Sequence, residues 1–411
     1  MNVFETKKDV TTEFDGLKVK VGGQFALQFQ GVGQTNEWNN DTTAGVPELQ
    51  ELGSNFNLPT ANLDLDVQLA DGLRMHLRTY LSARHHPEAW VKGGYIQMDN
   101  LDFVKEDFLS DLMDITSVRI GMDEINYGDA HYRRSDNARA IYNPFVGNYI
   151  MDAFTTEAFA EFTFQPKDFI IVAGISNGKL NQSPVKGTYD YTPSIYGKLG
   201  WDSQVNEDLR VRITGSVYTN GNYNRGYLYG GDRAGSRYYN IMYTEDASYD
   251  NDFSGRFNPG FTKFTSFQAN PFVKWKGFEF FGVYEMCMGD LRDDDTKDVD
   301  GRLVAQGGAY TQIGAELIYR FGSWEQFYVG GRYNTVSGYS SESAGEVMTG
   351  STDDMRTGVD RINAGLGWFM TKNVIAKLEY VNQNYTGNGY SGSNFDNGNF
   401  NGIMFEAAIA F

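Results

Sequence analysis

Apolar and polar residues alternate along much of this chain in segments of about ten residues, the length of a strand that crosses a membrane. The segment 18–32 carries two such rows, with Val19, Val21, Gly23, Phe25, Leu27 and Phe29 in one and Lys18, Lys20, Gln24, Gln28 and Gln30 in the other. Successive side chains of a strand point to opposite faces, so this period of two predicts a strand with one apolar and one polar face.

The same alternation predicts sixteen antiparallel strands, which make the chain 1–411 a single all-β domain. They lie at 18–32, 60–70, 73–81, 89–99, 115–122, 153–164, 169–176, 194–202, 209–220, 264–275, 278–288, 308–321, 326–335, 359–369, 374–383 and 399–411. An even number of strands is typical of a transmembrane β-barrel of the bacterial outer membrane. Sixteen strands also match a barrel wide enough for an aqueous channel.

The hairpin between 60–70 and 73–81 shows how the strands pair. Keeping both apolar faces on one side places Leu69 opposite Leu73, which makes Ala70-Asp71-Gly72 a three-residue loop with Gly72 in the left-handed conformation. The same register brings opposite charges together across the hairpin, Asp64 with Arg78 and Asp66 with His76. In a second hairpin, a two-residue turn at Lys276-Gly277 places Lys274 opposite Glu279.

The predicted connections alternate between short turns and long loops, of which 221–263 is the longest. Outer-membrane barrels have short periplasmic turns and long extracellular loops, and the chain follows this pattern. The connection at 100–114 breaks it, and we expect a short amphipathic helix there on the periplasmic side. Tryptophans support the orientation, because four of the six lie near predicted short turns, as in an aromatic belt: Trp201, Trp275, Trp324 and Trp368.

Composition excludes several other classes of protein. No stretch approaches the roughly 18 consecutive apolar residues of a transmembrane helix, and no repeat of about 40–50 residues indicates a soluble propeller. The net charge of −18 argues against a nucleic-acid partner. The start, MNVFETKKDV, contains no signal-peptide core. We therefore expect a chain whose signal has been removed, with outer-membrane lipid and lipopolysaccharide as partners.

The closing segment RINAGLGWFMTKNVIAKLEYVNQNY and the terminal strand ending at Phe411 resemble the porin superfamily. The early segment LDLDVQLADGLRMHLRTYLSAR and the acid-rich segment after the fourth strand look most like the phosphate-selective porin O and P group or a general porin of Bacteroidota. The resemblance covers nearly the whole chain, but it rests on pattern rather than on invariant motifs. It implies a homotrimer in a Gram-negative outer membrane, with one loop folded into the pore.

The candidate for that loop is 123–152, which contains three arginines within seven residues: Arg133, Arg134 and Arg139. At a narrow constriction they would create a positive field that the low-dielectric walls strengthen. Alternatively, they pair with Asp129, Asp136 and lipopolysaccharide outside the pore.

Further candidate pore residues lie in the polar rows of the strands. The basic ones are Arg74, Arg78, Arg210, Arg212, Arg320, Arg332 and Arg361, with His76 beside them. They share the wall with Asp64, Asp66, Glu279, Glu285, Glu316, Glu379 and Glu406. Because this balance is near neutral, the phosphate selectivity of the resembled group is not carried over. The charges could also simply pair across strands in a wet wall.

Other chemistry has weaker support in the sequence. An enzyme would need a histidine beside a serine or aspartate, and the four histidines are His76, His85, His86 and His131. The acidic loop with Asp293, Asp295, Asp298 and Asp300 offers calcium ligands, but without EF-hand spacing. The Tyr-rich loop 221–263 suits stacking on sugars or, as we favour, packing onto a neighbouring subunit.

Together these observations predict a porin for passive diffusion of ions and small hydrophilic solutes, with no cofactor and no enzymatic activity. The alternative is a substrate-specific outer-membrane transporter, for example of anions or sugars. A barrel enzyme is the third possibility.

Overall fold

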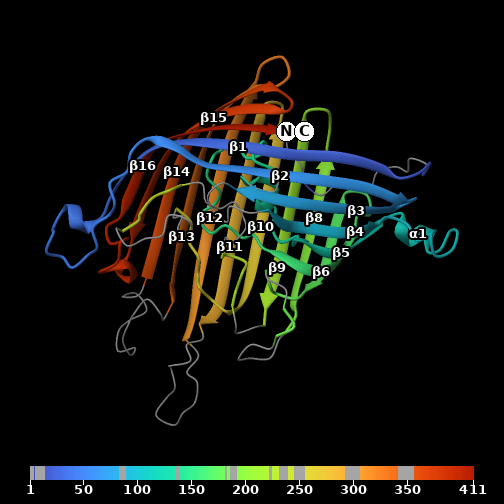
Figure 1. Cartoon of the computed structure of the whole chain (residues 1–411), viewed down its shortest axis with the longest axis horizontal. Helices are drawn as coiled ribbons and strands as arrows, with labels where there is room; N and C mark the ends of the chain where they lie inside the picture. The colour runs from blue at the N-terminus through green and yellow to red at the C-terminus, as the bar shows by residue number, and fades with distance from the viewer. Residues whose placement is uncertain are drawn as a thin grey trace, which may run out of the picture.

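The computed structural model describes residue 4 and residues 14–82, 89–135, 139–180, 183–185, 192–221, 225–230, 239–244, 255–291, 306–340 and 356–411. In this part of the chain, sixteen antiparallel strands close into one barrel in which each strand pairs with its neighbours in sequence and β1 pairs with β16 (Figure 1). The strands are β1 Lys18–Thr35, β2 Asn55–Ala70, β3 Leu73–Ser82, β4 Trp90–Met98, β5 Thr116–Glu124, β6 Thr156–Phe164, β7 Phe169–Ser176, β8 Ser194–Gln204, β9 Leu209–Asn220, β10 Lys263–Trp275, β11 Phe278–Leu291, β12 Gln306–Phe321, β13 Phe327–Ser340, β14 Arg356–Thr371, β15 Val374–Thr386 and β16 Asn399–Ala410.

Alternation decides which face of each strand meets lipid. On β14, Ile362 and Leu366 point outward and are 53% and 54% exposed, whereas Arg361 and Asn363 point inward and are buried. The same contrast recurs around the barrel, so an apolar exterior encloses a polar interior. Among the described residues, no helix combines the length and the apolar character needed to cross a membrane.

Register confirms most of the predicted pairing. Asp64 pairs with Arg78, Asp66 with His76, and Lys274 with Glu279 across the Lys276-Gly277 turn. The β2–β3 turn is tighter than predicted, because Ala70 itself pairs with Leu73 and a bulge falls at Leu69. Only Asp71 and Gly72 remain in the turn, and Gly72 has the predicted left-handed conformation with φ of +61°.

The predicted helix at 100–114 is wrong in extent. The only regular helix in this connection is α1, Ser110–Met113. Asp107 and Leu109 have φ of 56° and 54°, and these left-handed residues interrupt the helix that the apolar spacing suggested. Local turns replace it.

Short 3₁₀ segments complete the described elements: η1 Glu37–Asn39, η2 Ala130–Arg133 and η5 Asn388–Tyr390. The sixth strand starts at Thr156 and not at 153 as predicted. The three residues before it belong to the preceding connection, which is anchored where the Ile125 amide donates to the Thr155 carbonyl at 3.2 Å.

Candidate functional site: the barrel interior

The described parts of the connection between β5 and β6, residues 125–135 and 139–155, lie inside the barrel, and we call this connection the inserted loop. Its backbone bonds to inward-facing side chains on the far wall. The Ile150 amide donates to Asn334 at 2.6 Å, and the Met151 amide donates to Gln312 at 2.8 Å. The Val146 amide donates to Glu379 at 2.8 Å. The inserted loop therefore covers the inner faces of β12, β13 and β15.

Asp129 bonds the inserted loop to the barrel wall through its carboxylate. Its carboxylate accepts two bonds from Arg212, at 2.8 and 2.9 Å, one from Lys198 at 2.9 Å and one from Thr214 at 2.8 Å. All four side chains are buried. Burial opposes ionisation of Asp129, but the cations Lys198 and Arg212 outweigh it and hold the pKa of this carboxyl below its ordinary value.

The three arginines of the inserted loop each meet a carboxylate inside the barrel. Arg133 bonds Glu279 at 2.5 Å and Glu316 at 3.2 Å. The other two pairs are Arg134 with Asp152 and Arg139 with Glu124. The sequence left open a pairing with Asp129 and Asp136 outside the pore. Asp129 instead binds wall cations, and Asp136 falls outside the described residues.

Most arginines of the wall also bond to carboxylates. Arg78 forms two bonds with Asp64, at 2.9 and 3.1 Å, and Arg332 bonds Glu316 at 2.7 Å, in both cases with its partner in strand register. Further pairs are Arg74 with Asp99, Arg210 and Arg212 with Asp202, and Arg320 with Glu279. Arg361 differs, since it donates to Gln383 and to the carbonyl of Asn148.

The connection between β9 and β10 also enters the barrel. Tyr229 donates to Glu285 at 2.7 Å, beside Tyr127 of the inserted loop, which donates to the same carboxylate at 3.1 Å. Tyr239 bonds Glu379, and Tyr243 is buried as well. Tyr229, Tyr239 and Tyr243 therefore pack within their own barrel, whereas Tyr223 and Tyr238 of the same loop fall outside the described residues. Their rings are too buried to offer an open platform for a sugar.

Two lysines of the barrel wall bond to the inserted loop, which the sequence did not indicate. Lys377 donates to the carbonyls of Ala140, Asn143 and Phe145 at 2.8 to 3.2 Å, and Lys198 bonds the Gly128 carbonyl at 2.8 Å as well as Asp129. The alternation did place Lys377 on the polar face. Nothing in the local sequence indicates that its partners would be backbone carbonyls of a distant loop.

Phe4 also lies inside the barrel, which the sequence did not indicate. Its ring is 4% exposed and packs against Phe272 at 5.3 Å and Tyr132 at 5.9 Å between ring centroids. The Arg212 guanidinium lies 4.2 Å from the centre of the same ring. This aromatic and cationic contact fills the space next to the Asp129 cluster.

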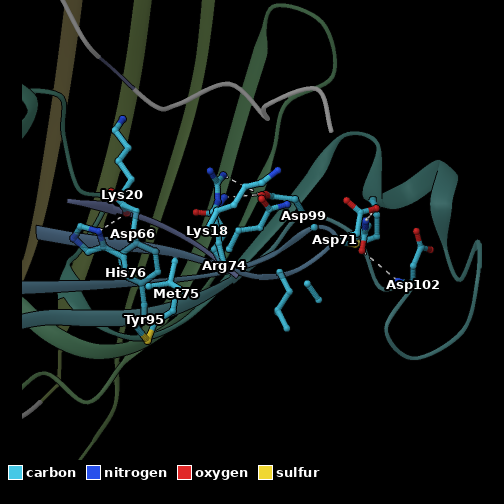
Figure 2. Close-up of a pocket in the computed structure, with 18 of the residues that line it drawn as sticks. Lys18, Lys20, Asp66, Asp71, Arg74, Met75, His76, Tyr95, Asp99 and Asp102 are labelled. Atoms are coloured by element: carbon cyan, nitrogen blue, oxygen red, sulfur yellow. Dashed lines mark hydrogen bonds and ion pairs between the residues drawn. The ribbon is translucent and has the colours of Figure 1, made fainter. Parts of the chain in front are cut away.

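A cavity of about 1010 Å³ opens against β1 to β4 at the end of the barrel that carries the β2–β3 turn, the predicted periplasmic end, and we call it the vestibule. Inward-facing residues of adjacent strands line it, among them Lys18, Lys20, Asp66 and Arg74 (Figure 2). His76 stacks on Tyr95 at 5.1 Å and bonds Asp66 at 2.8 Å. Of the predicted pore residues, Asp66, Arg74 and His76 line the vestibule.

The remaining candidate sites are placed as follows. His131 is buried against Glu124 at 3.3 Å, and burial lowers its pKa. No group of three metal-ligating side chains occurs in the part of the chain that the structure describes. Outside that part lie His85 and His86 and the calcium candidates Asp293, Asp295, Asp298 and Asp300.

No family model and no curated protein matches the chain. Solved structures do share its fold. The outer membrane channel DcaP of Acinetobacter baumannii is 10% identical, with a TM-score of 0.54 over 97% of this chain and 99% of that one. An anion-selective porin from Comamonas acidovorans is 9% identical, with a TM-score of 0.50 over 96% and 100%. OmpT of Vibrio cholerae, an outer membrane protein in trimer form, is 12% identical, with a TM-score of 0.52 over 97% and 100%.

These likenesses show a shared fold, the 16-stranded barrel of outer-membrane proteins. The apolar side chains exposed around the outside of the barrel are typical of a surface in contact with lipid, and their exposure to water would be unfavourable. Fold and exterior together place the chain in a bacterial outer membrane.

Proposed function

We propose that this protein is an outer-membrane channel for passive diffusion of ions and small hydrophilic solutes. The observation that carries the proposal is the polar, charged interior, which opens to the periplasmic side through the vestibule. The charged side chains Lys18, Lys20, Asp66 and Arg74 line the vestibule beside apolar ones such as Val19 and Met75, so a hydrophilic solute finds polar partners there. The fold shared with the DcaP channel and with the Comamonas porin supports the same role.

The inserted loop limits where solutes can pass. On β14, every inward-facing residue from Thr357 to Phe369 is buried. The vestibule lies against β1 to β4, so we infer that solutes pass along β1 to β5. There Arg139 of the inserted loop, with 21% of its side chain exposed, faces Glu124. We infer that this pair, close to Arg78 and Asp64, forms the constriction.

A substrate-specific transporter is the second candidate, and one observation favours it. Tyr229 and Tyr239 add a second layer of loop to the interior and bond wall carboxylates. Loop residues from two connections fill the interior, which narrows the path for solutes and suits selection by size and charge.

We do not infer phosphate selectivity, because nearly every pore arginine already bonds to a carboxylate. We infer a homotrimer, as in the OmpT structure of this fold.

Purified protein in a planar lipid bilayer tests the proposal. Stepwise conductance that increases with salt concentration supports a diffusion channel. Steps that a single sugar or anion blocks at low concentration support the specific transporter. Silent bilayers together with lipase or protease activity in detergent would overturn both in favour of an enzyme.

Arg139→Ala tests the inferred constriction. Removing this side chain at the narrowest point should increase single-channel conductance. Arg256→Ala is the matched control, because it makes the same change at a half-buried arginine that bonds the carbonyl of Tyr229 in the connection between β9 and β10. Equal conductance of wild type and Arg139→Ala would place the constriction elsewhere.

A further inference from the structure

The connection 99–115 extends past the periplasmic ends of β3, β4 and β5 (Figure 1). It exposes an unusual concentration of apolar side chains for a turn region. Phe103, Val104, Leu109 and Leu112 are 49%, 64%, 49% and 45% exposed. Contiguous exposed apolar surface of this kind marks contact with a partner or a membrane.

The side chains of this connection divide into two faces. Asp102, Asp107 and Asp114 line the vestibule together with Ser110 (Figure 2 labels Asp102). The four exposed apolar residues do not line it. Three carboxylates of the connection thus lie at the pore mouth, together with Phe108 and Met113, and the four most exposed apolar side chains do not.

Its backbone is satisfied by local turns. The amide of Val104 donates to the Leu101 carbonyl at 2.9 Å, that of Phe108 to Lys105 at 3.0 Å, and that of Met113 to Leu109 at 2.9 Å. Such internal bonding reduces the number of unpaired backbone groups that the segment would bring to a lipid interface. The irregular backbone suits the headgroup region rather than the hydrocarbon core.

The apolar face continues the lipid-facing exterior of the barrel. On β5, Ile120 points outward and is 48% exposed, and Ile115, just before the strand, is 39% exposed. Leu112 lies in the connection directly before this strand. We infer that lipid covering the outside of β5 also reaches this face.

We propose that residues 101–115 form a membrane foot, in which Phe103, Val104, Leu109 and Leu112 enter the headgroup region of the periplasmic leaflet. The foot holds the carboxylates of Asp102, Asp107 and Asp114 at the pore mouth. A second copy of the chain is a poorer occupant, because the segment 101–115 carries five carboxylates against the single cation Lys105. Two such surfaces would repel each other.

Site-directed spin labelling tests the foot independently of any conductance. The native Cys287 is fully buried, so a cysteine introduced on the surface labels selectively. Leu112→Cys and Val104→Cys report the apolar face, and Ser110→Cys, on the same segment, reports the vestibule face. Ile313→Cys on the outer wall and Glu207→Cys in an exposed turn calibrate lipid and water.

With the labelled proteins in phospholipid vesicles, relaxation by oxygen, which concentrates in lipid, is compared with relaxation by a water-soluble nickel chelate. For the labels at positions 112 and 104, the ratio of relaxation by oxygen to relaxation by nickel should be several-fold higher than for the label at position 110. It should approach the ratio of the lipid-exposed label at position 313. A ratio equal to that at 207 would mean that the apolar face lies in water. Spin–spin broadening between copies would mean that a second copy covers it. Either result overturns the proposal.

Discussion

Asp129 joins the inserted loop to β8 and β9 through a single carboxylate. Lys198 and Arg212 supply the charge and Thr214 a neutral hydroxyl bond. Because the site is buried, neither cation has water to replace a lost partner. We therefore expect the position of the inserted loop to depend on this residue.

Asp129→Asn should destabilise the barrel by about 3–5 kcal/mol, since it removes the carboxylate that the buried cations Lys198 and Arg212 share and leaves Arg212 only the more distant Asp202. It should also raise conductance, because the inserted loop loses this anchor. Urea unfolding in detergent micelles and single-channel recording measure the two effects. Glu207→Gln, the same change at an exposed turn, is the control. Unchanged stability would show that Asp129 does not hold the loop.

The unfolding free energies of wild type and Asp129→Asn should depend differently on pH. The pKa of folded Asp129 lies below the value of about 3.9 for an unfolded aspartate. Its stabilisation is therefore complete above about pH 4 and is lost as pH falls further towards the folded pKa. The gap in unfolding free energy between wild type and Asp129→Asn should stay constant from pH 7 to about pH 5 and shrink below about pH 4. A gap that shrinks already near neutral pH would contradict this.

The side chain of Phe4 carries no charge and affects the lumen through the volume that it occupies. Its ring occupies the space between Phe272 and Arg212, so Phe4→Ala should widen the lumen and increase conductance. Phe14→Ala removes an identical ring that is 37% exposed and should leave conductance unchanged. If both variants conduct like wild type, the Phe4 ring does not restrict the path.

At the scale of elements, the β2–β3 turn depends on Gly72. A Cβ at this position would lie 2.3 Å from the side chain of Asn100, and its φ of +61° also disfavours other residues. Gly72→Ala should therefore destabilise the barrel by about 1–2 kcal/mol. Gly215→Ala is the control, because nothing lies within 4 Å of its added Cβ. Equal urea midpoints for the two variants would show that the turn tolerates a side chain.

The strands could be predicted from the sequence because lipid on one side and polar groups on the other impose a period of two. That period gave the pairing of Asp64 with Arg78 in the wall. The partners of the inserted loop could not be predicted, since no local pattern links Asp129 to Lys198 or Lys377 to the Asn143 carbonyl. The segment 100–114 was misread because apolar spacing does not reveal left-handed residues such as Leu109.

On the scale of the whole molecule, charges inside the barrel largely cancel and those at its mouth do not. Because ion pairs such as Arg332 with Glu316 neutralise each other, they exert only a weak electric field on an ion that passes through the barrel. The vestibule is lined by six aspartates but only three lysines and arginines. Since the mouth is open to solvent, its excess negative charge acts over about one Debye length and is screened by salt.

We therefore expect weak cation selectivity that grows as salt is diluted. Reversal potentials across a tenfold KCl gradient should indicate preference for K⁺, with a larger preference at about 0.01–0.1 M than near 1 M, where the Debye length falls to about 3 Å. The triple variant Asp102→Asn, Asp107→Asn and Asp114→Asn should abolish most of it. Asp41→Asn, in the connection from β1 to β2 on the opposite rim, is the control. Anion preference in the wild type would mean that the arginines of the inserted loop, and not the mouth, set the selectivity.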